Sequence, residues 1–445
     1  MPNAECRMPN GNPERPSPVL SALPRAGNGH FSFLPVKARD QRNRLEGRLI
    51  VGQSGGCTHV MNASLSGVVS EARRSARVTA VWGARHGIEG VLSGHLVNLS
   101  GESEDSLRRI GRAPGAALGS CRRKINDSQA AAAVETFREN NVRFFIYIGG
   151  NDSADTAHRL ALAARRADYR LSVLCVPKTI DNDLPLTDHS PGYGSAARFI
   201  ASVVTDVGRE TEAVRTNEPV KIIEVKGRNA GWLAAAAALA KHSDRDAPQL
   251  VWPPEIPFSE EKFLRLVQRS LREIGYCLAV VAETVRDAKG RPIAQRGRKP
   301  PADAFGHPRL AGAAEYLCEL LKERLGVRAR YDLPGSIQRM SSAHFSDVDL
   351  NESRASGAWA VRFALRGSSD CMVVMRRRRG GKYGVEFACA PLSKIANSEK
   401  KLPAGFFDRR AMLPTAAFRR YALPLVGAGL PDHARLVGKP VRLRE

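Results

Sequence analysis

The sequence predicts an α/β protein in which parallel strands alternate with helices. Short apolar runs bounded by turn residues recur along the chain, and stretches with helical spacing lie between them. Short continuous apolar runs are typical of strands buried on both faces, which occur in parallel sheets covered by helices. A length of 445 residues with 43% hydrophobic composition also favours two or more lobes, each with a buried core.

Each element follows from a local pattern. The apolar runs predict strands at residues 48–51, 78–82, 144–148, 171–176, 221–225 and 278–281, and the first four of these end directly before Gly or Pro. Apolar residues at helical spacing predict helices at residues 60–72, 128–139, 154–165, 196–212 and 232–240. Residues 286–308 are rich in Gly, Pro and charge, which predicts a long surface excursion.

Composition excludes several classes of protein. The longest apolar runs, such as residues 233–240, fall well short of the roughly 20 residues that cross a bilayer, so we expect no membrane partner. Residues 1–35 lack the order of a secretory signal, and we expect residues 1–45 to be a disordered lead-in. Eight scattered cysteines without a C-x-x-C pair argue against a zinc site or a disulfide framework. A cytoplasmic location fits best.

The net charge of +23 raises nucleic acid as a partner, but the basic residues are not clustered enough for that reading. Only Arg376–Arg379 forms a tight block, and aromatic residues make up just 6% of the chain. A solvated surface explains this block, and attraction of small anions is the alternative. We expect no nucleic-acid partner.

Ligands of parallel sheets bind at the carboxyl ends of strands, so the loops after the strands are the candidate sites. Residues 52–56, Gly-Gln-Ser-Gly-Gly, lead into a helix, where backbone N–H groups and the helix dipole favour an anion. Close packing explains such a turn equally well. Residues 149–153, Gly-Gly-Asn-Asp-Ser, follow another strand and can hold a metal–phosphate group, although an Asn or Asp before a helix also serves as an N-cap.

The most specific loop is residues 177–183, Pro-Lys-Thr-Ile-Asp-Asn-Asp, which places a lysine and two carboxylates within six positions. A carboxylate beside a cation and a phosphate can act as general base toward a hydroxyl group. A polar turn without chemistry is the alternative. Residues 224–232 add basic side chains beside two glycines, and residues 333–339 place an arginine where its guanidinium can bind a phosphate.

Together these loops resemble the phosphofructokinase family, and the resemblance runs from about residue 48 to about residue 397. Six motifs occur in the family's order: Gly-Gly at 55–56, Ser-Cys-Arg at 120–122, Gly-Gly-x-x-Ser at 149–153, Thr-Ile-Asp-Asn-Asp at 179–183, Gly-Arg-Asn-Ala-Gly-Trp at 227–232 and Gly-x-Ile-Gln-Arg at 335–339. The resemblance implies two similar Rossmann-like lobes with parallel sheets flanked by helices and an active site in the cleft between them. It assigns residues 46–195 and 340–400 to a phosphoryl-donor lobe, and residues 196–339 and 401–445 to a sugar phosphate lobe.

The resemblance also implies an activity, the phosphorylation of fructose 6-phosphate at its C1 hydroxyl with Mg²⁺. Asp181 resembles the general base, and Glu283 is similar to a glutamate that contacts the sugar. Arg330 matches an arginine that family members lend across a subunit interface, which implies a homodimer or homotetramer. The implied substrate-binding set is Thr179, Ile180, Asp181, Asp183, Lys226, Gly227, Arg228, Glu283, Arg330, Ser336, Ile337, Gln338 and Arg339.

Two positions resemble the branch of the family that uses pyrophosphate instead of ATP. Asp152 stands where the ATP-using branch has a glycine, and a carboxylate there occupies the space of a nucleotide's α-phosphate and repels it. Lys178 replaces a small residue and can neutralise charge on a departing phosphate. The implied donor site comprises Gly55, Gly56, Arg122, Asp152 and Ser153, with Lys178 as a second catalytic residue. The reaction is then readily reversible and serves both glycolysis and gluconeogenesis.

Several positions depart from the family pattern. Asn151 stands where many relatives have an aspartate on magnesium, so it is the candidate metal ligand with a neutral amide. Lys226 replaces a methionine, Ser336 replaces a histidine, and Pro219 falls where the ATP-using branch supplies an intersubunit arginine, for which Lys221 is a possible substitute. The alternatives to the pyrophosphate reading are an ATP-dependent phosphofructokinase, a non-catalytic sugar phosphate-binding relative and a basic nucleic-acid-binding protein.

Overall fold

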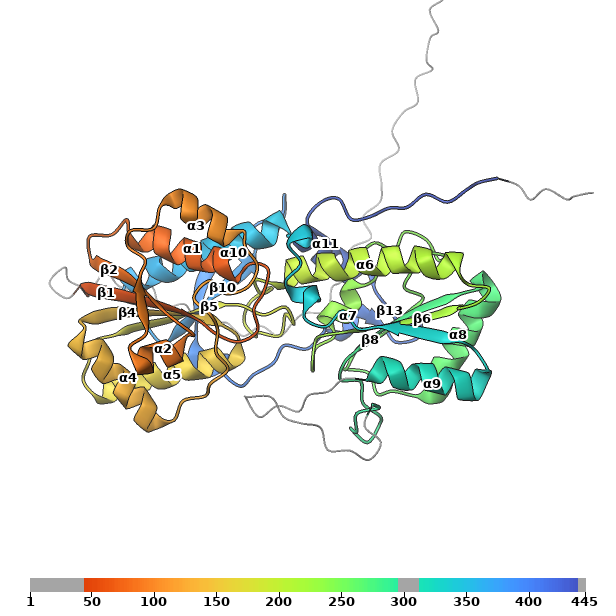
Figure 1. Cartoon of the computed structure of the whole chain (residues 1–445), viewed down its shortest axis with the longest axis horizontal. Helices are drawn as coiled ribbons and strands as arrows, with labels where there is room; N and C mark the ends of the chain where they lie inside the picture. Colours follow the sequence, from red (N-terminus) through yellow and green to blue (C-terminus); the bar gives the residue numbers. More distant parts are fainter. Residues whose placement is uncertain (1–43, 295–311, 439–445) are drawn as a thin grey trace, which may run out of the picture. The chain divides into compact units, whose positions relative to one another are not determined.

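The computed structural model describes residues 44–294 and 312–438. The expected disordered lead-in at residues 1–45 therefore lies almost entirely outside the described residues, as does much of the expected excursion at 286–308. The described strands form a seven-stranded sheet, a four-stranded sheet and a short two-stranded pair (Figure 1).

The seven-stranded sheet has the order β11-β10-β5-β4-β1-β2-β3. Its five inner strands run parallel, as the sequence predicts, whereas β3 and β11 pair antiparallel at the two edges. Antiparallel neighbours need only a short connection, and seven residues join β10 to β11. The strands are β1 (Gly47–Gln53), β2 (Val78–Ala84), β3 (Leu96–Asn98), β4 (Val142–Gly149), β5 (Ser172–Pro177), β10 (Cys371–Arg377) and β11 (Val385–Pro391).

Helices cover both faces of this sheet because successive side chains of a strand point to opposite sides. In β4, Phe144, Ile146 and Ile148 pack into one apolar core, and Phe145 and Tyr147 pack into the other. The first core includes α1 (Met61–Ala72), α3 (Glu104–Gly111) and α10 (Asp347–Leu365). The second includes α2 (Ile88–Ser93), α4 (Asp127–Glu139) and α5 (Asn151–Arg166).

The four-stranded sheet has the order β7-β8-β6-β9, and all of its strands run parallel. Its strands are β6 (Val220–Val225), β7 (Leu250–Trp252), β8 (Cys277–Ala282) and β9 (Ala329–Asp332). One apolar core joins β6, β7 and β8 to α6 (Tyr193–Ala213), α7 (Trp232–Ala236), α8 (Glu260–Ile274), α9 (Ala313–Leu325) and α11 (Ala416–Val426). The remaining short pieces are β12 (Phe407–Asp408), β13 (Leu413–Pro414) and 3₁₀ turns at Ile337–Arg339, Ser342–His344, Leu392–Lys394 and Ala404–Phe406.

All six strands and five helices proposed from the sequence are present, most with ends within three residues of the prediction. The exception is the helix expected at 232–240, because α7 ends at Ala236 and the chain continues through i→i−3 hydrogen bonds of the 3₁₀ type. The predicted lobe boundaries stay predictions. Within the described ranges, every helix is too short or too polar to cross a bilayer.

Candidate functional site

The turn between β1 and α1 forms a cradle where three cationic side chains meet. Gly55 adopts φ +82°, and a Cβ on it would lie 2.9 Å from Nζ of Lys178. A Cβ on Gly56 would lie 2.9 Å from Nη1 of Arg339 and 3.5 Å from Nη2 of Arg122. The N–H of Gly55 donates to the carbonyl oxygen of Cys121 at 2.9 Å. Because neither glycine has a side chain, a ligand can approach this turn closely beside three positive charges, an arrangement that suits a polyanion.

Lys178 is the most buried of these cations, with 4% of its surface exposed. Burial, together with the charges of Arg339 and Arg122, lowers the pKa of Lys178 to about 8. The Nε–H of Arg339 is also buried and has no hydrogen-bond acceptor. Buried donors without acceptors cost free energy, so an incoming anion that accepts from them is favoured.

The loop between β4 and α5 lies beside this cradle, since the N–H of Lys178 donates to the carbonyl oxygen of Gly149 at 3.0 Å. Gly150 is the N-cap of α5 and provides no side-chain acceptor, so no side chain caps the first N–H groups of the helix. Asn151 is the first helical residue, and its Oδ1 atom is buried without a partner. A Cβ on Gly149 would lie only 2.0 Å from Oγ of Ser153, so the hydroxyl of Ser153 fills the space that a side chain at position 149 would need.

Asp152, the proposed specificity residue, forms an ion pair with Lys124 at 3.3 Å. Lys124 was not among the candidates from the sequence, where nothing distinguishes it from other basic residues. The pair weakens the purely electrostatic repulsion between Asp152 and a phosphate. The side chain still occupies the first turn of α5, so its steric effect is unchanged.

The turn after β5 carries two half-buried carboxylates, Asp181 and Asp183. The backbone N–H of Asp181 donates to Oγ1 of Thr179 at 3.1 Å. Burial and the neighbouring Asp183 and Glu283 carboxylates raise the pKa of Asp181 to about 7, against the opposing effect of Arg228. Burial also raises the pKa of Asp183. A carboxyl group that titrates near neutral pH is suited to accept a proton.

Loops from the second sheet complete the surroundings of Asp181. Nζ of Lys226 lies 3.2 Å from Oε2 of Glu283, and both groups act electrostatically on Asp181. The backbone of Gly227, at φ +135°, carries the chain past Lys226 to Arg228, whose charge also acts on Asp181. Residues from both sheets therefore meet around one titratable carboxyl group.

Four other predicted residues are placed less directly. The side chain of Ile180 is buried in the apolar core of the second sheet, so only its backbone is available to a substrate. The side chain of Gln338 is 1% exposed, and its Oε1 accepts from the N–H of Lys226 at 3.0 Å. Ser336 and Ile337 are exposed.

Arg330 lies on β9 at the edge of the second sheet, where it is exposed and pairs with Glu218. Its role across a subunit interface stays a prediction. Lys221, the possible substitute for an intersubunit arginine, lies near Glu210 and Asp332 at 3.6 and 3.5 Å.

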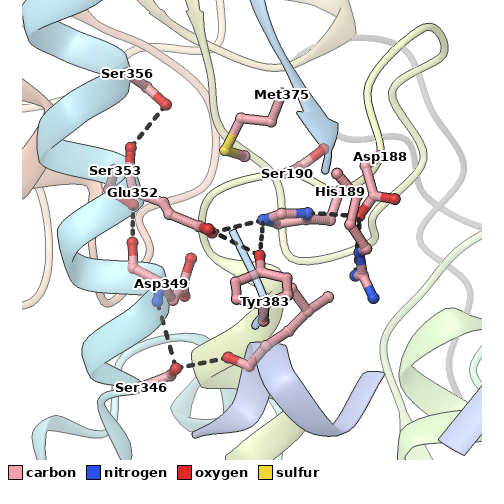
Figure 2. Close-up of polar contacts among 12 residues, drawn as sticks. Asp188, His189, Ser190, Ser346, Asp349, Glu352, Ser353, Ser356, Met375 and Tyr383 are labelled. Carbon is pink, nitrogen blue, oxygen red and sulfur yellow. Dashed lines mark hydrogen bonds and ion pairs between the residues drawn. The ribbon is translucent and has the colours of Figure 1, made fainter. Parts of the chain in front are cut away.

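Sequence reasoning missed a polar cluster around His189, in the segment that follows the Asp181 turn (Figure 2). Of the basic block, Arg376, Arg378 and Arg379 are exposed, as the solvated-surface reading predicts. Arg377 instead turns inward, and its guanidinium donates to Oδ1 of Asp188 at 3.0 and 3.2 Å. The alternation of side chains along a strand could have indicated this. Arg377 is the last residue of β10, and its side chain points to the face opposite that of its exposed neighbour Arg376.

A family model described as phosphofructokinase matches residues 48–363. The chain belongs to the phosphofructokinase family. It is 40% identical over 391 residues to a pyrophosphate–fructose 6-phosphate 1-phosphotransferase from Xanthomonas campestris pv. campestris, covering 86% of this chain and 93% of that protein.

Two further comparisons agree. A protein of the same name from Methylococcus capsulatus is 37% identical over 399 residues, covering 86% of this chain and 94% of the relative. The crystal structure of a pyrophosphate-dependent phosphofructokinase from Marinobacter aquaeolei superposes with a TM-score of 0.78 at 33% identity, covering 89% of this chain and 98% of that one. The expected phosphofructokinase fold is therefore confirmed.

Proposed function

We propose that this phosphofructokinase transfers a phosphoryl group from inorganic pyrophosphate to the C1 hydroxyl of fructose 6-phosphate. The products are fructose 1,6-bisphosphate and orthophosphate, and the reaction runs in both directions. The observation that carries the choice of donor is the pair Lys178 and Asp152. A buried ammonium points at the glycine cradle, and a carboxylate fills the start of α5 beside it.

The donor pyrophosphate binds in the cradle, where Gly55 and Gly56 allow close approach and Arg122 and Lys178 supply positive charge. The N–H groups at the start of α5, including that of Ser153, add donors on the neighbouring side. Positioning and charge neutralisation provide most of the acceleration in phosphoryl transfer, which needs little covalent chemistry from the protein.

The sugar phosphate binds against residues 226–228, Glu283 and Arg339, with its C1 hydroxyl toward Asp181. Asp181 accepts the hydroxyl proton as the oxygen attacks the phosphoryl group, for which a pKa of about 7 is well matched. Lys226 and Glu283 form an ion pair, so a sugar hydroxyl can hydrogen-bond to both without leaving an isolated buried charge.

Magnesium fits the donor end of this site. The buried Oδ1 of Asn151 has no partner and is a hard oxygen ligand of the kind that Mg²⁺ accepts. A Mg²⁺ ion here would be held by Asn151 together with substrate phosphates, which is how this ion is commonly bound. Bound Mg²⁺ would neutralise charge on the phosphates, and Asn151 would orient it.

The direct test offers purified protein fructose 6-phosphate and Mg²⁺ with either pyrophosphate or ATP, and follows fructose 1,6-bisphosphate through aldolase. We expect pyrophosphate to be preferred by about 100-fold or more in kcat/KM, since the side chain of Asp152 occupies space at the start of α5 that the α-phosphate of ATP would need. Orthophosphate and fructose 1,6-bisphosphate should regenerate fructose 6-phosphate. A preference for ATP would reject the donor assignment and leave the sugar kinase reading.

A matched pair of variants separates the role of Lys178 from burial alone. Lys241 lies beside the second sheet, and burial lowers the pKa of Lys241 to about 8, as it does for Lys178. Lys178→Met should lower turnover with pyrophosphate by about 100-fold or more, whereas Lys241→Met should leave it unchanged. Equal losses in both variants would indicate a structural role for Lys178.

Location and assembly complete the proposal. A cytoplasmic enzyme agrees with a site built for phosphorylated metabolites. In a homodimer or homotetramer, the exposed Arg330 at the edge strand β9 would be available to a partner subunit.

A further inference from the structure

The turn that carries Asp181 is closed by its return segment, residues 184–192. The N–H of Thr179 donates to the carbonyl oxygen of Pro191 at 3.1 Å. Inside the turn, the buried side chain of Asn182 accepts from the N–H of Ser190 at 3.0 Å. Nδ2 of Asn182 also donates to the hydroxyl of Tyr421 at 2.9 Å. Because Asn182 directly follows Asp181, Ser190 and Tyr421 together restrain the position of the candidate base.

His189 directly precedes Ser190, and its side chain is almost completely buried, with 3% exposed. Its Nδ1 lies 2.9 Å from Oδ1 of Asp188, and its Nε2 lies 2.7 Å from Oε2 of Glu352 on α10 (Figure 2). A neutral imidazole has one N–H group, so it can donate to only one of two carboxylates. The protonated ring donates to both, and this geometry therefore fits an imidazolium cation.

Each carboxylate beside His189 is held in place by other groups. Arg377 on β10 donates to Asp188 at 3.0 and 3.2 Å. The hydroxyl of Tyr383 donates to Oε1 of Glu352 at 2.8 Å and lies 3.4 Å from Nε2 of the ring. Burial raises the pKa of Tyr383, so this hydroxyl remains a donor over the physiological range.

Two further charged groups face the return segment. Asp349, one helical turn before Glu352, accepts from the N–H groups of Gly192 and Ser195 at 2.9 Å each. Nζ of Lys400 donates to the carbonyl oxygens of Thr187 and Asp188 at 3.1 and 2.8 Å. The hydroxyl of Tyr421 on α11 also donates to the carbonyl oxygen of Asp188 at 2.8 Å. The groups around the imidazole are thus three carboxylates, one guanidinium, one ammonium and two phenols, and a protonated ring balances their charge.

We propose that His189, as a cation, is a positioning residue that ties the return segment of the catalytic turn to α10 and so fixes Asp181 against the donor phosphates. This inference rests on the proposed function for its kinetic effect, but its structural effect is independent of it. The link runs from Glu352 through His189 and Ser190 to Asn182, and each step is a hydrogen bond or a covalent neighbour.

The proton on the ring makes this link dependent on pH. Burial lowers the pKa of His189, but its hydrogen bonds to Asp188 and Glu352 outweigh burial and raise it above the usual value. Loss of the proton leaves two hydrogen-bond acceptors facing each other within 3 Å on one side of the ring. The return segment then loses its contact with Glu352 but keeps the one between Gly192 and Asp349, so its middle shifts and Asp181 is held less tightly. A displacement of about 1 Å can lower turnover by about 100-fold.

Two variants separate the proton from the contact. His189→Gln keeps one donor and removes the cation, so it should lower kcat by about tenfold to 100-fold with both KM values within about twofold. Glu352→Gln supplies an amide N–H that can donate a hydrogen bond to Nε2 of a neutral imidazole. This variant should therefore keep kcat near the wild-type value. The control is His158→Gln, which removes a similar contact, 2.7 Å from Nδ1 to Asp370, at a remote position on α5.

Hydrogen exchange of residues 178–192 in the substrate-free protein provides the structural readout. In the wild type, protection corrected for intrinsic exchange should fall as pH rises through the pKa of His189, and in Glu352→Gln this dependence should be absent. Wild-type kcat in His189→Gln, or pH-independent protection in the wild type, would overturn the inference. Absence of turnover in the wild type would reject the proposed function, while the exchange experiment would still decide the role of His189.

Discussion

Replacing Asp181 with asparagine separates the proton acceptor from the shape of the site. The amide occupies nearly the same volume as the carboxylate, but it cannot take the proton of the C1 hydroxyl. A positioned general base contributes about 10²–10⁴-fold to a rate. This factor corresponds to about 3–5 kcal/mol of activation free energy at 1.36 kcal/mol per tenfold. We expect kcat to fall by this factor, with the KM for fructose 6-phosphate changed little.

The same substitution should stabilise the fold at alkaline pH. Burial and the Asp183 and Glu283 carboxylates raise the pKa of Asp181 from 3.8 to about 7. The folded protein therefore retains a proton that the unfolded chain releases between these values, and the free energy of unfolding falls as pH rises through this window. Above pH 7 the full cost is present, with an upper bound of about 4 kcal/mol. Asparagine removes this cost.

The assay measures turnover with pyrophosphate and the melting temperature at pH 5 and pH 8. The variant should have a higher melting temperature than the wild type at pH 8. The difference should be smaller at pH 5, where Asp181 of the folded wild type is mostly protonated. Turnover like that of the wild type would refute the base assignment. A stability gain that is equal at both pH values would refute the electrostatic account of Asp181.

Three further changes test other parts of the site. Gly56→Ala places a Cβ 2.9 Å from Nη1 of Arg339, so the dissociation constant for pyrophosphate should rise by about tenfold or more. Isothermal titration with pyrophosphate measures this constant. Asp152→Gly combined with Lys178→Gly should shift the ratio of kcat/KM values toward ATP, and an unchanged ratio contradicts the crowding argument. Asp349→Ala removes the acceptor of two backbone N–H groups at the start of α6, so urea unfolding should show a loss of about 3 kcal/mol.

The sequence predicted the central strands and their alternation with helices. Each of these strands is a continuous apolar run, which is typical of a strand covered by helices on both faces. It also placed the three loops that meet around Lys178, since parallel strands bring their carboxyl ends to one edge of a sheet. The antiparallel edge strands β3 and β11 were not foreseen, because β3 has only three residues and the partly buried β11 lacks the continuous apolar run of a strand covered on both faces.

The polar cluster at His189 was beyond sequence reasoning for a different reason. Its partners Glu352 and Tyr383 are separated from His189 by more than 160 residues along the chain, and each is an ordinary residue in its own segment. Only the packing of α10 against the return segment brings them together. The same applies to Lys124, whose pairing with Asp152 depends on the loop before α4.

The short 3₁₀ turn at Ile337–Arg339 has neighbouring residues committed to opposite partners. Gln338 holds the backbone of Lys226, and Arg339, which is proposed to bind the sugar phosphate, also reaches over Gly56 in the donor cradle. A ligand that immobilises one of these side chains also restrains the other. The second ligand therefore binds with a smaller loss of conformational entropy. Each substrate should therefore tighten the dissociation constant of the other by the same factor, as thermodynamic reciprocity requires.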